Sequence, residues 1–326
     1  MPILLTGVAG FIGYHVAEAL LARGEAVVGV DNLNTYYDVR LKQARLARLE
    51  GRGGFTFRRC DLADRDAVAE LAVAHTSVTR IVHLAAQAGV RYSLIDPYAY
   101  VAANVTGHLA VLELARRLPR LEHLLYASSS SVYGANASLP FAEGDRVDTP
   151  LSLYAATKRA DELMSHAYGH LFGMPQTGLR FFTVYGPWGR PDMAYFAFAE
   201  AILRGDPITV YDDGTVRRDF TYVDDVVAGV LGCLDRPPSD ESPPVRLLNV
   251  GNNHSEPVAA LISALEVALG RRAVVRSAPR PLADVAETFA DVRAIAALTG
   301  FRPATPLAVG IPRFAAWFLD WQAARA

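Results

Sequence analysis

A glycine-rich turn between a short apolar strand and a helix constrains the fold of this chain more than any other feature. The strand Ile3–Leu5 runs directly into TGVAGFIG, after which a helix is predicted to extend through Arg23. Gly7 permits the tight turn, Gly10 lets the backbone approach a pyrophosphate, and Gly13 allows the helix to pack closely on the strand. The helix N-terminus favours that negative charge. This order of elements predicts a dinucleotide-binding unit, and a glycine-rich turn without a ligand is the alternative.

The end of the next predicted strand, Ala26–Val30, indicates which dinucleotide binds. Asp31 follows this strand. An acid at this place accepts hydrogen bonds from the adenosine ribose hydroxyls and repels a 2′-phosphate, which favours NAD over NADP. Arg40 and Lys42 follow in a basic segment and keep NADP open. A simple turn residue is the alternative role for Asp31.

Three later segments extend this prediction. Asp61 follows the third predicted strand, where it can face the adenine edge or cap the helix that begins at Arg65. The fourth strand, Arg80–Leu84, leads into small residues, AAQAG, against which a cofactor can lie. A helix over Pro97–Leu118 contains Asn104. An asparagine inside a helix either binds a ligand or makes a structural hydrogen bond, and both readings stay open.

Tyr154 and Lys158 are the candidate acid–base pair. They stand four residues apart in a segment that opens a helix extending to about Leu171, so both side chains lie on one helix face. A phenol has a reference pKa of about 10, and a neighbouring ammonium lowers this pKa. The pair is therefore a minimal acid–base device for an alcohol or a carbonyl. Such pairs also occur by chance on many helices.

A run of four serines, 128–131, supports the functional interpretation of this pair. It follows the predicted strand His123–Ala127, and apolar residues flank it on both sides, unlike a flexible linker. Open α/β sheets bind ligands at the carboxyl ends of their strands. One of these hydroxyls can therefore reach the same substrate oxygen as Tyr154.

The alternation of strands and helices predicts an α/β fold with a Rossmann-type, doubly wound parallel sheet. We expect residues 1–183 to form the NAD-binding domain, with segments of about 216–255 returning to it. High glycine and proline density after the strand Thr177–Phe182 indicates that the chain leaves the sheet there. Residues 184–326 are expected to form a smaller C-terminal α/β domain that binds the substrate. Its paired Arg217 and Arg218 are either a phosphate site or a surface salt-bridge pair.

Composition narrows the class of partner. The net charge of −2 and the scattered basic residues give no reason to expect nucleic acid or an anionic membrane. No apolar run is long enough to cross a bilayer. Cys60 and Cys233 form neither a disulfide framework nor a metal-ligand spacing, so we expect no metal. These features predict a cytoplasmic protein.

Several motifs occur together in one order: TGVAGFIG, HLAAQAGVR, SSSSVYG, YAATK, RFFTVYGP and RRDFTYVDD. This set resembles the extended short-chain dehydrogenase/reductase family, in its sugar-nucleotide branch, over nearly the whole chain. The longer strings DNLNTYYDVRLKQARLARL, SLYAATKRADELM and LRFFTVYGPWGRPDM are similar to UDP-glucuronate 4-epimerases of that family. The resemblance implies bound NAD, a UDP-sugar substrate, and a homodimer packed through the helices that begin near Tyr98 and Tyr154.

The resemblance also implies roles for individual residues. Tyr154 matches the catalytic base, Lys158 its partner, and Ser129 the hydroxyl that shares the substrate oxygen. The positions implied for NAD binding are Gly7, Gly10, Phe11, Ile12, Gly13, Asp31, Asn32, Asn34, Asp61, Leu62, Leu84, Ala85, Ala86, Gln87, Asn104, Tyr154, Lys158 and Phe182. Those implied for substrate binding are Gln87, Ser129, Ser130, Ser131, Tyr154, Thr183, Arg190, Tyr211, Arg218 and Asp284. The segment Pro281-Leu282-Ala283-Asp284 departs from the family, whose members usually carry a glycine before the aspartate.

The residues after Ser129 favour one activity within the branch. Dehydratases resembling this chain carry an Asp-Glu pair there, and UDP-glucuronate decarboxylases carry a Glu in that region. This chain has Ser130 and Ser131 and no acid, which favours 4-epimerisation of UDP-glucuronate through a 4-keto intermediate. The alternatives are a 4-epimerase of a neutral UDP-hexose, then a UDP-glucuronate decarboxylase. A non-catalytic NAD-sensing protein is the alternative from another class, and the intact Ser129, Tyr154 and Lys158 argue against it.

Overall fold

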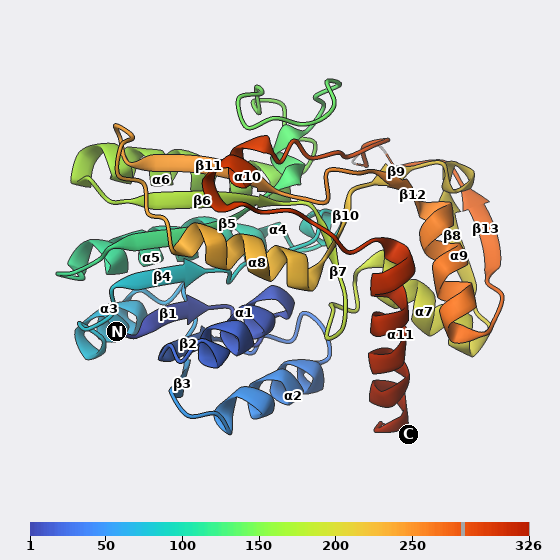
Figure 1. The fold of residues 1–326 in the computed structure, drawn as a ribbon, viewed down its shortest axis with the longest axis horizontal. Helices are drawn as coiled ribbons and strands as arrows, with labels where there is room; N and C mark the ends of the chain where they lie inside the picture. The colour runs from blue at the N-terminus through green and yellow to red at the C-terminus, as the bar shows by residue number, and fades with distance from the viewer. Residues whose placement is uncertain (282–283, 326) are drawn as a thin grey trace.

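The computed structural model describes residues 1–281 and 284–325, and its centre is a seven-stranded parallel sheet (Figure 1). The strand order is β11-β6-β5-β4-β1-β2-β3, so the direction of winding reverses between β1 and β4. Ligands of open α/β sheets bind at such a reversal. The strands are β1 (Ile3–Thr6), β2 (Val27–Asp31), β3 (Phe55–Arg59), β4 (Arg80–His83), β5 (His123–Ser129), β6 (Gln176–Phe181) and β11 (Val245–Val250). The predicted Rossmann-type sheet is confirmed.

Helices cover both faces of this sheet, as the doubly wound prediction requires (Figure 1). One face carries α1 (Phe11–Ala22), α2 (Val39–Glu50), α8 (Val223–Leu234) and α10 (Arg293–Thr299). The other carries α3 (Arg65–Ala74), α4 (Pro97–Tyr100), α5 (Gly107–Arg117) and α6 (Leu153–Phe172). A parallel sheet covered on both faces needs apolar side chains on both, and for this reason its strands read as nearly continuous apolar runs.

Neighbouring residues of one strand enter two separate cores. Leu4 is in register with Val28 and Ile81, and all three pack in the core against α3 and α5. Leu5 and Val82 point the other way, into the core that includes α1 and α8. The alternation of side chains along each strand thus fixes the register of the sheet, because a slip of one residue would exchange the two cores.

A second group of elements lies beside the sheet. It contains α7 (Ala194–Arg204), β8 (Pro207–Tyr211), α9 (Val258–Leu269), β13 (Val274–Ala278) and α11 (Leu307–Ala323), with β8 and β13 paired in parallel. Phe196, Phe314 and Phe318 pack together between α7 and α11. Two short pairs connect this group to the sheet: β7 (Thr183–Tyr185) with β10 (Phe220–Tyr222), and β9 (Arg217–Arg218) with β12 (Glu256–Pro257).

The long helix predicted over 97–118 is interrupted in the structure. A π-helical turn, η2 (Val101–Thr106), separates α4 from α5 and contains the buried Asn104. Such turns insert an extra residue and re-aim side chains, and they are frequent at functional sites. Short 3₁₀ turns occupy η1 (Tyr92–Leu94), η3 (Ser130–Tyr133) and η4 (Asp212–Gly214).

Two observations concern predictions made above. Within residues 1–281 and 284–325, no helix is both long enough and apolar enough to cross a bilayer. Leu282 and Ala283, in the segment that departs from the family pattern, lie outside the described residues.

Candidate active site

A cavity of about 430 Å³ opens at the carboxyl ends of the sheet strands. Its walls come from the glycine turn after β1, the segments after β2, β4, β5 and β6, the start of α6, and the second group of elements. Strand ends that are far apart in the sequence meet here because the strands are parallel, which is why the candidate residues are spread over most of the chain.

The glycine turn forms one end of this cavity and leaves no room for side chains. Gly7 has φ of +72°, and a Cβ there would lie 2.7 Å from the backbone nitrogen of Ala85. A Cβ on Gly13 would lie 2.1 Å from the carbonyl oxygen of Gly7. The N-cap of α1, Gly10, provides no side-chain hydrogen bond, so the first amides of α1 face the cavity without a protein cap. This geometry fits the pyrophosphate of a dinucleotide.

Asp31 is held at the end of β2 by two backbone amides. Its carboxylate accepts hydrogen bonds from Ala9 at 3.1 Å and from Leu33 at 2.8 Å. Of the two basic residues that kept NADP open, Arg40 does not line the cavity and pairs with Asp38 at 2.8 Å. Lys42 lines the cavity within electrostatic reach of Asp31, and its ammonium binds Asn34. The buried carboxylate of Asp31 lines the cavity at the end of β2, where an acid fits NAD better than NADP.

Tyr154, Lys158 and Ser129 line the same stretch of the cavity. The helix α6 begins where the Ser152 hydroxyl accepts a hydrogen bond from the Ala155 amide at 3.1 Å, which places Tyr154 in its first turn. The Lys158 ammonium donates to the Ala127 carbonyl at 3.0 Å. A base, its cationic partner and a hydroxyl thus converge from α6 and β5, which is an arrangement that can move a proton at an alcohol.

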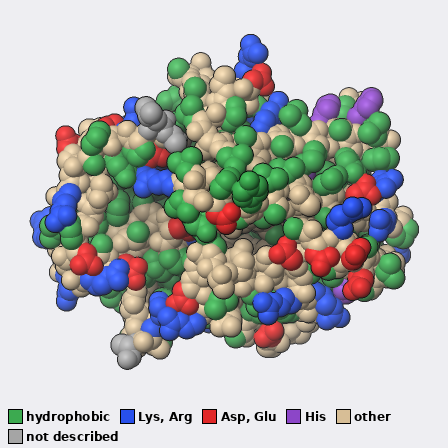
Figure 2. All heavy atoms as spheres, turned by 180° about the vertical axis from the view of Figure 1, so that it is seen from behind, with side chains coloured by type: hydrophobic (Ala, Val, Ile, Leu, Met, Phe, Trp, Pro, Cys, Tyr) green, Lys and Arg blue, Asp and Glu red, His purple; other side chains and the backbone are tan. Residues whose placement is uncertain are grey.

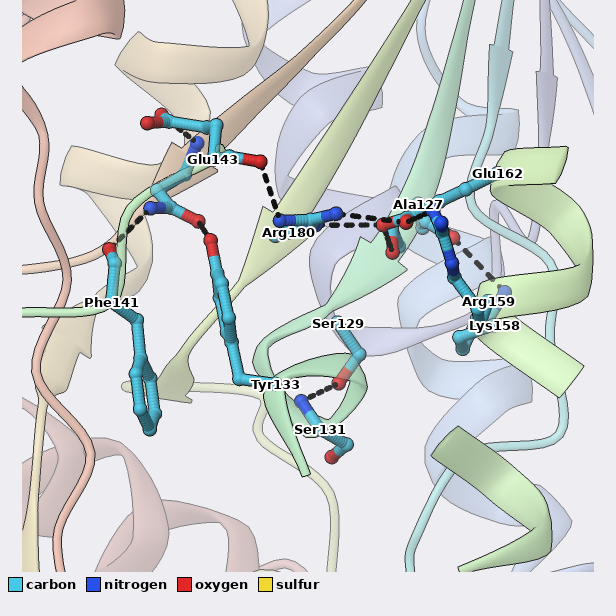
Figure 3. A network of polar contacts seen from close by, with 12 residues as sticks. Ala127, Ser129, Ser131, Tyr133, Phe141, Glu143, Lys158, Arg159, Glu162 and Arg180 are labelled. Carbon is cyan, nitrogen blue, oxygen red and sulfur yellow. Dashed lines mark hydrogen bonds and ion pairs between the residues drawn. The ribbon is translucent and has the colours of Figure 1, made fainter. Parts of the chain in front are cut away.

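The serine run is supported by a buried polar network (Figure 3). The Ser128 hydroxyl donates to Glu162 at 2.6 Å, and Arg180 holds the same carboxylate through two nitrogens at 2.8 and 2.9 Å. Arg180 also lies 4.8 Å from the centre of the Tyr133 ring, and the Tyr133 hydroxyl binds Asn249 at 2.7 Å. Ser128, directly before Ser129, is therefore fixed through Glu162 to Arg180 on β6. Tyr133, four residues after Ser129, is fixed to Asn249 on β11.

Sequence reasoning did not single out Glu162, Arg180 or Asp161, all of which are buried. For the two acids, the sequence does contain one signal, which is their position on the helix relative to Lys158. Acids three and four residues after Lys158 lie on the same side of α6 as the lysine, so they face the sheet rather than solvent. A buried carboxylate requires a cation, and Arg180 on the adjacent strand supplies one for Glu162.

Arg190 reaches the cavity from the loop after β7, and its charge is partly compensated. Its guanidinium binds Asp192 through two nitrogens at 3.0 and 2.7 Å, and the Tyr36 hydroxyl donates to the same carboxylate at 3.2 Å. Burial and Asp192 together raise the pKa of Tyr36 above its ordinary value. Arg190 is therefore held in a fixed position while one side of it remains available to an anion.

One fully buried arginine connects the glycine turn to the loop that precedes Arg190. Arg45, on α2, donates to the carbonyl of Ala9 in the glycine turn at 2.9 Å. It also donates to the carbonyls of Trp188 at 2.6 Å and Gly189 at 3.0 Å, directly before Arg190. Its other two bonds go to the Tyr37 hydroxyl at 2.7 Å and, from Nε, to the Trp188 carbonyl again at 3.1 Å.

The second group of elements supplies a cation at the far end of the cavity. Of the paired arginines, Arg218 lines the cavity, whereas Arg217 lies 3.3 Å from Glu287. Asp284 also lines the cavity and pairs with Arg91 at 2.9 Å. The guanidinium of Arg91 lies 4.9 Å from the centre of the Tyr211 ring.

Most of the residues assigned from the sequence surround this one cavity. Asn104 and Tyr211 do not line it. The Asn104 amide group binds the backbone nitrogen and oxygen of Gln87 and the Thr157 hydroxyl, so its contacts are structural. The residues assigned from the sequence that do line the cavity are Gly7, Gly10, Phe11, Ile12, Gly13, Asp31, Asn32, Asn34, Asp61, Leu62, Leu84, Ala85, Ala86, Gln87, Ser129, Ser130, Ser131, Tyr154, Lys158, Phe182, Thr183, Arg190, Arg218 and Asp284.

Comparisons with known proteins agree with this geometry. Residues 3–251 match the model of the NAD dependent epimerase/dehydratase family. A probable UDP-glucuronate 4-epimerase of Rhizobium meliloti is 46% identical over 98% of this chain and 97% of its own length. The crystal structure of a UDP-glucuronic acid 4-epimerase from Bacillus cereus, with UDP-glucuronic acid and NAD, has a TM-score of 0.90 at 32% identity, covering 98% of this chain and 100% of that one. A UDP-glucose 4-epimerase of Thermotoga maritima has a TM-score of 0.86 at 28% identity, covering 99% and 100%.

Proposed function

The chain belongs to the NAD-dependent epimerase/dehydratase family, and within this family we propose that the protein is a UDP-glucuronate 4-epimerase. It interconverts UDP-glucuronate and UDP-galacturonate. The observation that carries the proposal is the neutral hydroxyl wall of Ser129, Ser130 and Ser131 beside Tyr154 and Lys158, with Arg190 in the same cavity. The similarity to the probable UDP-glucuronate 4-epimerase of Rhizobium meliloti and the UDP-glucuronic acid 4-epimerase of Bacillus cereus supports the same substrate.

The glycine turn, Asp31 and the open N-terminus of α1 fit NAD and would hold its pyrophosphate and adenosine ribose. When bound, NAD supplies the acceptor and donor of hydride for carbon 4 of the sugar. The Tyr154 phenol oxygen removes the proton of the 4-hydroxyl and returns it when the 4-keto group is reduced. Lys158 stabilises the phenolate, and Ser129 orients the same oxygen. Both epimers form because the keto sugar presents either face of carbon 4.

The hydroxyl wall also explains why the carboxyl group is retained. A 4-keto glucuronate is a β-keto acid, which loses carbon dioxide when its carboxylate stands perpendicular to the carbonyl plane. Ser130, Ser131 and Arg190 hold the carboxylate by hydrogen bonds and charge, away from that orientation. A carboxylate side chain in place of Ser130 or Ser131 would repel the carboxylate of the substrate. The family resemblance implies the same, because related decarboxylases and dehydratases carry acids in this region.

We also assign the two ligands to the two parts of the chain. NAD belongs to residues 1–183 with the returning segments of about 216–255, and the UDP-sugar belongs to residues 184–326. We place the protein in the cytoplasm, which its two free, buried thiols, Cys60 and Cys233, suit because reducing compartments keep thiols unpaired.

The reaction can be tested by proton NMR of the purified protein with UDP-glucuronate and no added reductant. We expect a UDP-galacturonate anomeric signal that settles at a fixed ratio, because bound NAD is regenerated in each cycle. Release of carbon dioxide with a UDP-pentose would instead identify a decarboxylase. Turnover of UDP-galactose without turnover of UDP-glucuronate would identify a neutral-sugar epimerase.

We propose that the protein works as a homodimer through the face formed by η1, α4, η2, α5 and α6. Leu94, Ile95 and Tyr98 are 71, 76 and 84% exposed there, and Leu163 on α6 is 55% exposed. Figure 2 shows this side of the molecule, with hydrophobic side chains gathered across it. Contiguous exposed apolar surface of this kind marks an interface.

Leu163→Glu tests the homodimer, because a charge at the centre of this face would be buried without a partner. Sedimentation should give the mass of two chains for the wild type and of one chain for the variant. Val267→Glu is the matched control, since Val267 is 85% exposed on α9. A wild-type protein with the mass of one chain would overturn this proposal.

A further inference from the structure

A second buried acid, next to Glu162, lies against the catalytic lysine. Asp161 is fully buried on α6, and its Oδ2 accepts a hydrogen bond from the Lys158 ammonium at 2.9 Å. Its Oδ1 has no hydrogen-bond partner among the described residues. Lys158 uses its other contact, at 3.0 Å, on the Ala127 carbonyl, so one N–H remains for the cavity that Lys158 lines.

The charges around this pair leave Asp161 as the acid that acts on Lys158. Glu162, the next residue, is occupied by Arg180 and Arg159. Among the residues with described positions, Asp161 is the only carboxylate within ion-pair distance of Lys158.

The other titratable groups packed against this pair are neutral or lie across the cavity. Burial lowers the pKa of His83, from β4, to about 3 and that of His108, from α5, well below its ordinary value. Burial likewise raises the pKa of Tyr126, from β5. Tyr100, from α4, contacts the Tyr154 ring edge-on, and burial raises its pKa to about 12. Arg190, in the loop across the cavity, is paired with Asp192.

We propose that Asp161 is a positioning residue that acts through Lys158, fixing its ammonium and setting the pH range in which Tyr154 serves as base. The inference rests on the proposed catalytic pair. It extends that pair to an ordered series of charges: carboxylate, ammonium, phenolate. The carboxylate is the counter-ion of the buried lysine, and it also opposes the positive potential that Lys158 creates at the phenol.

The pKa of Asp161 is raised to about 6 by burial, with Lys158 opposing the shift, so the carboxyl is ionised at neutral pH. Two consequences follow for a variant that lacks this negative charge. The phenolate of Tyr154 forms at a lower pH, because a repelling charge is gone. Lys158 loses its proton at a lower pH, because its counter-ion is gone. The acid limb and the basic limb of the profile of kcat against pH therefore both move to lower pH.

Asp161→Asn is the test, because the amide oxygen can still accept from Lys158 and the other side-chain atom makes no bond that would be lost. We expect both limbs of kcat against pH to shift to lower pH by about one unit. Ser165→Ala is the matched control, since Ser165 is buried one turn further along α6 and binds His108 without carrying charge. Its limbs should stay in place. A uniform loss of rate in Asp161→Asn with unmoved limbs would show a merely structural role and overturn the proposal.

A second readout keeps the test decisive if Asp161→Asn has no measurable turnover. The protein is labelled with ¹³Cζ-tyrosine, and the Tyr154 resonance is assigned by its loss in Tyr154→Phe. Its titration midpoint should fall by about one unit in Asp161→Asn. An unchanged or higher midpoint would refute the inference. This readout uses no substrate, so it is independent of whether the protein epimerises UDP-glucuronate.

Discussion

Tyr154→Phe is expected to lower kcat by about 10³-fold or more, because general acid–base catalysis at the sugar hydroxyl contributes rate factors of this size. Phenylalanine keeps the ring and its edge contact with Tyr100, whose centroid lies 5.9 Å away, so the fold and the cavity should be preserved. NAD should remain bound, because the glycine turn and Asp31, which we propose hold it, are unchanged in this variant. Turnover is measured by NMR, and bound NAD by chromatography of the denatured protein.

Tyr100→Phe is the matched control for this prediction. The Tyr100 hydroxyl donates to the backbone carbonyls of Ala88 and Gly89 and is not part of the proposed proton transfer. This variant should keep kcat within about tenfold of the wild type, a smaller change than the roughly 10²–10⁴-fold that a positioned proton-transfer group contributes. Full turnover in Tyr154→Phe would show that another group is the base.

Arg180→Met is expected to lower the free energy of unfolding by about 3–5 kcal/mol, because Glu162 would be left as a buried charge without its main partner. Arg180 and Glu162 are both fully buried, and the two nitrogen–oxygen distances are 2.8 and 2.9 Å (Figure 3). The free energy is measured by urea unfolding. Activity should fall as well, since Ser128 is bonded to the same carboxylate.

The double variant Arg180→Met with Glu162→Gln distinguishes a lost ion pair from lost packing. Removing both charges should recover part of the stability lost in Arg180→Met, because no unpaired charge then remains in the core. If the double variant is as unstable as the sum of the two single variants, the two charges do not depend on one another.

The fold was largely predictable because its local signals agree with one another. The strand predicted over Arg80–Leu84 differs from β4, Arg80–His83, by one residue at its end. The helix α2 was not predicted, because its buried face includes Lys42 and Arg45 and so has no clear apolar stripe. The π-helical turn η2 was also missed, since an inserted residue leaves no periodic signal in a helix that is otherwise continuous.

The location of the candidate site was predictable where residue type and spacing together indicate a chemistry, as for Tyr154 and Lys158, which both line the cavity. The residues of the site whose role depends on being buried could not be predicted from the sequence. Asp161 and Glu162 read as ordinary charged residues on a helix, and only the packing of α6 on the sheet turns them into buried acids next to the catalytic groups. Asn104 shows the reverse, since an unusual position in the sequence proved to carry structural hydrogen bonds to Gln87.

Arg45 has a consequence for the lifetime of the bound cofactor. Each of its five N–H donors is used within the protein, on the glycine turn at one end and on the loop before Arg190 at the other. Separating the glycine turn from the loop before Arg190 requires local unfolding around a fully buried guanidinium. Such openings are rare events in a native protein. An enzyme that regenerates its own oxidant has no need of exchange. A dinucleotide held between these two segments would stay bound from one turnover to the next, and the rate of catalysis would then not depend on the concentration of free NAD.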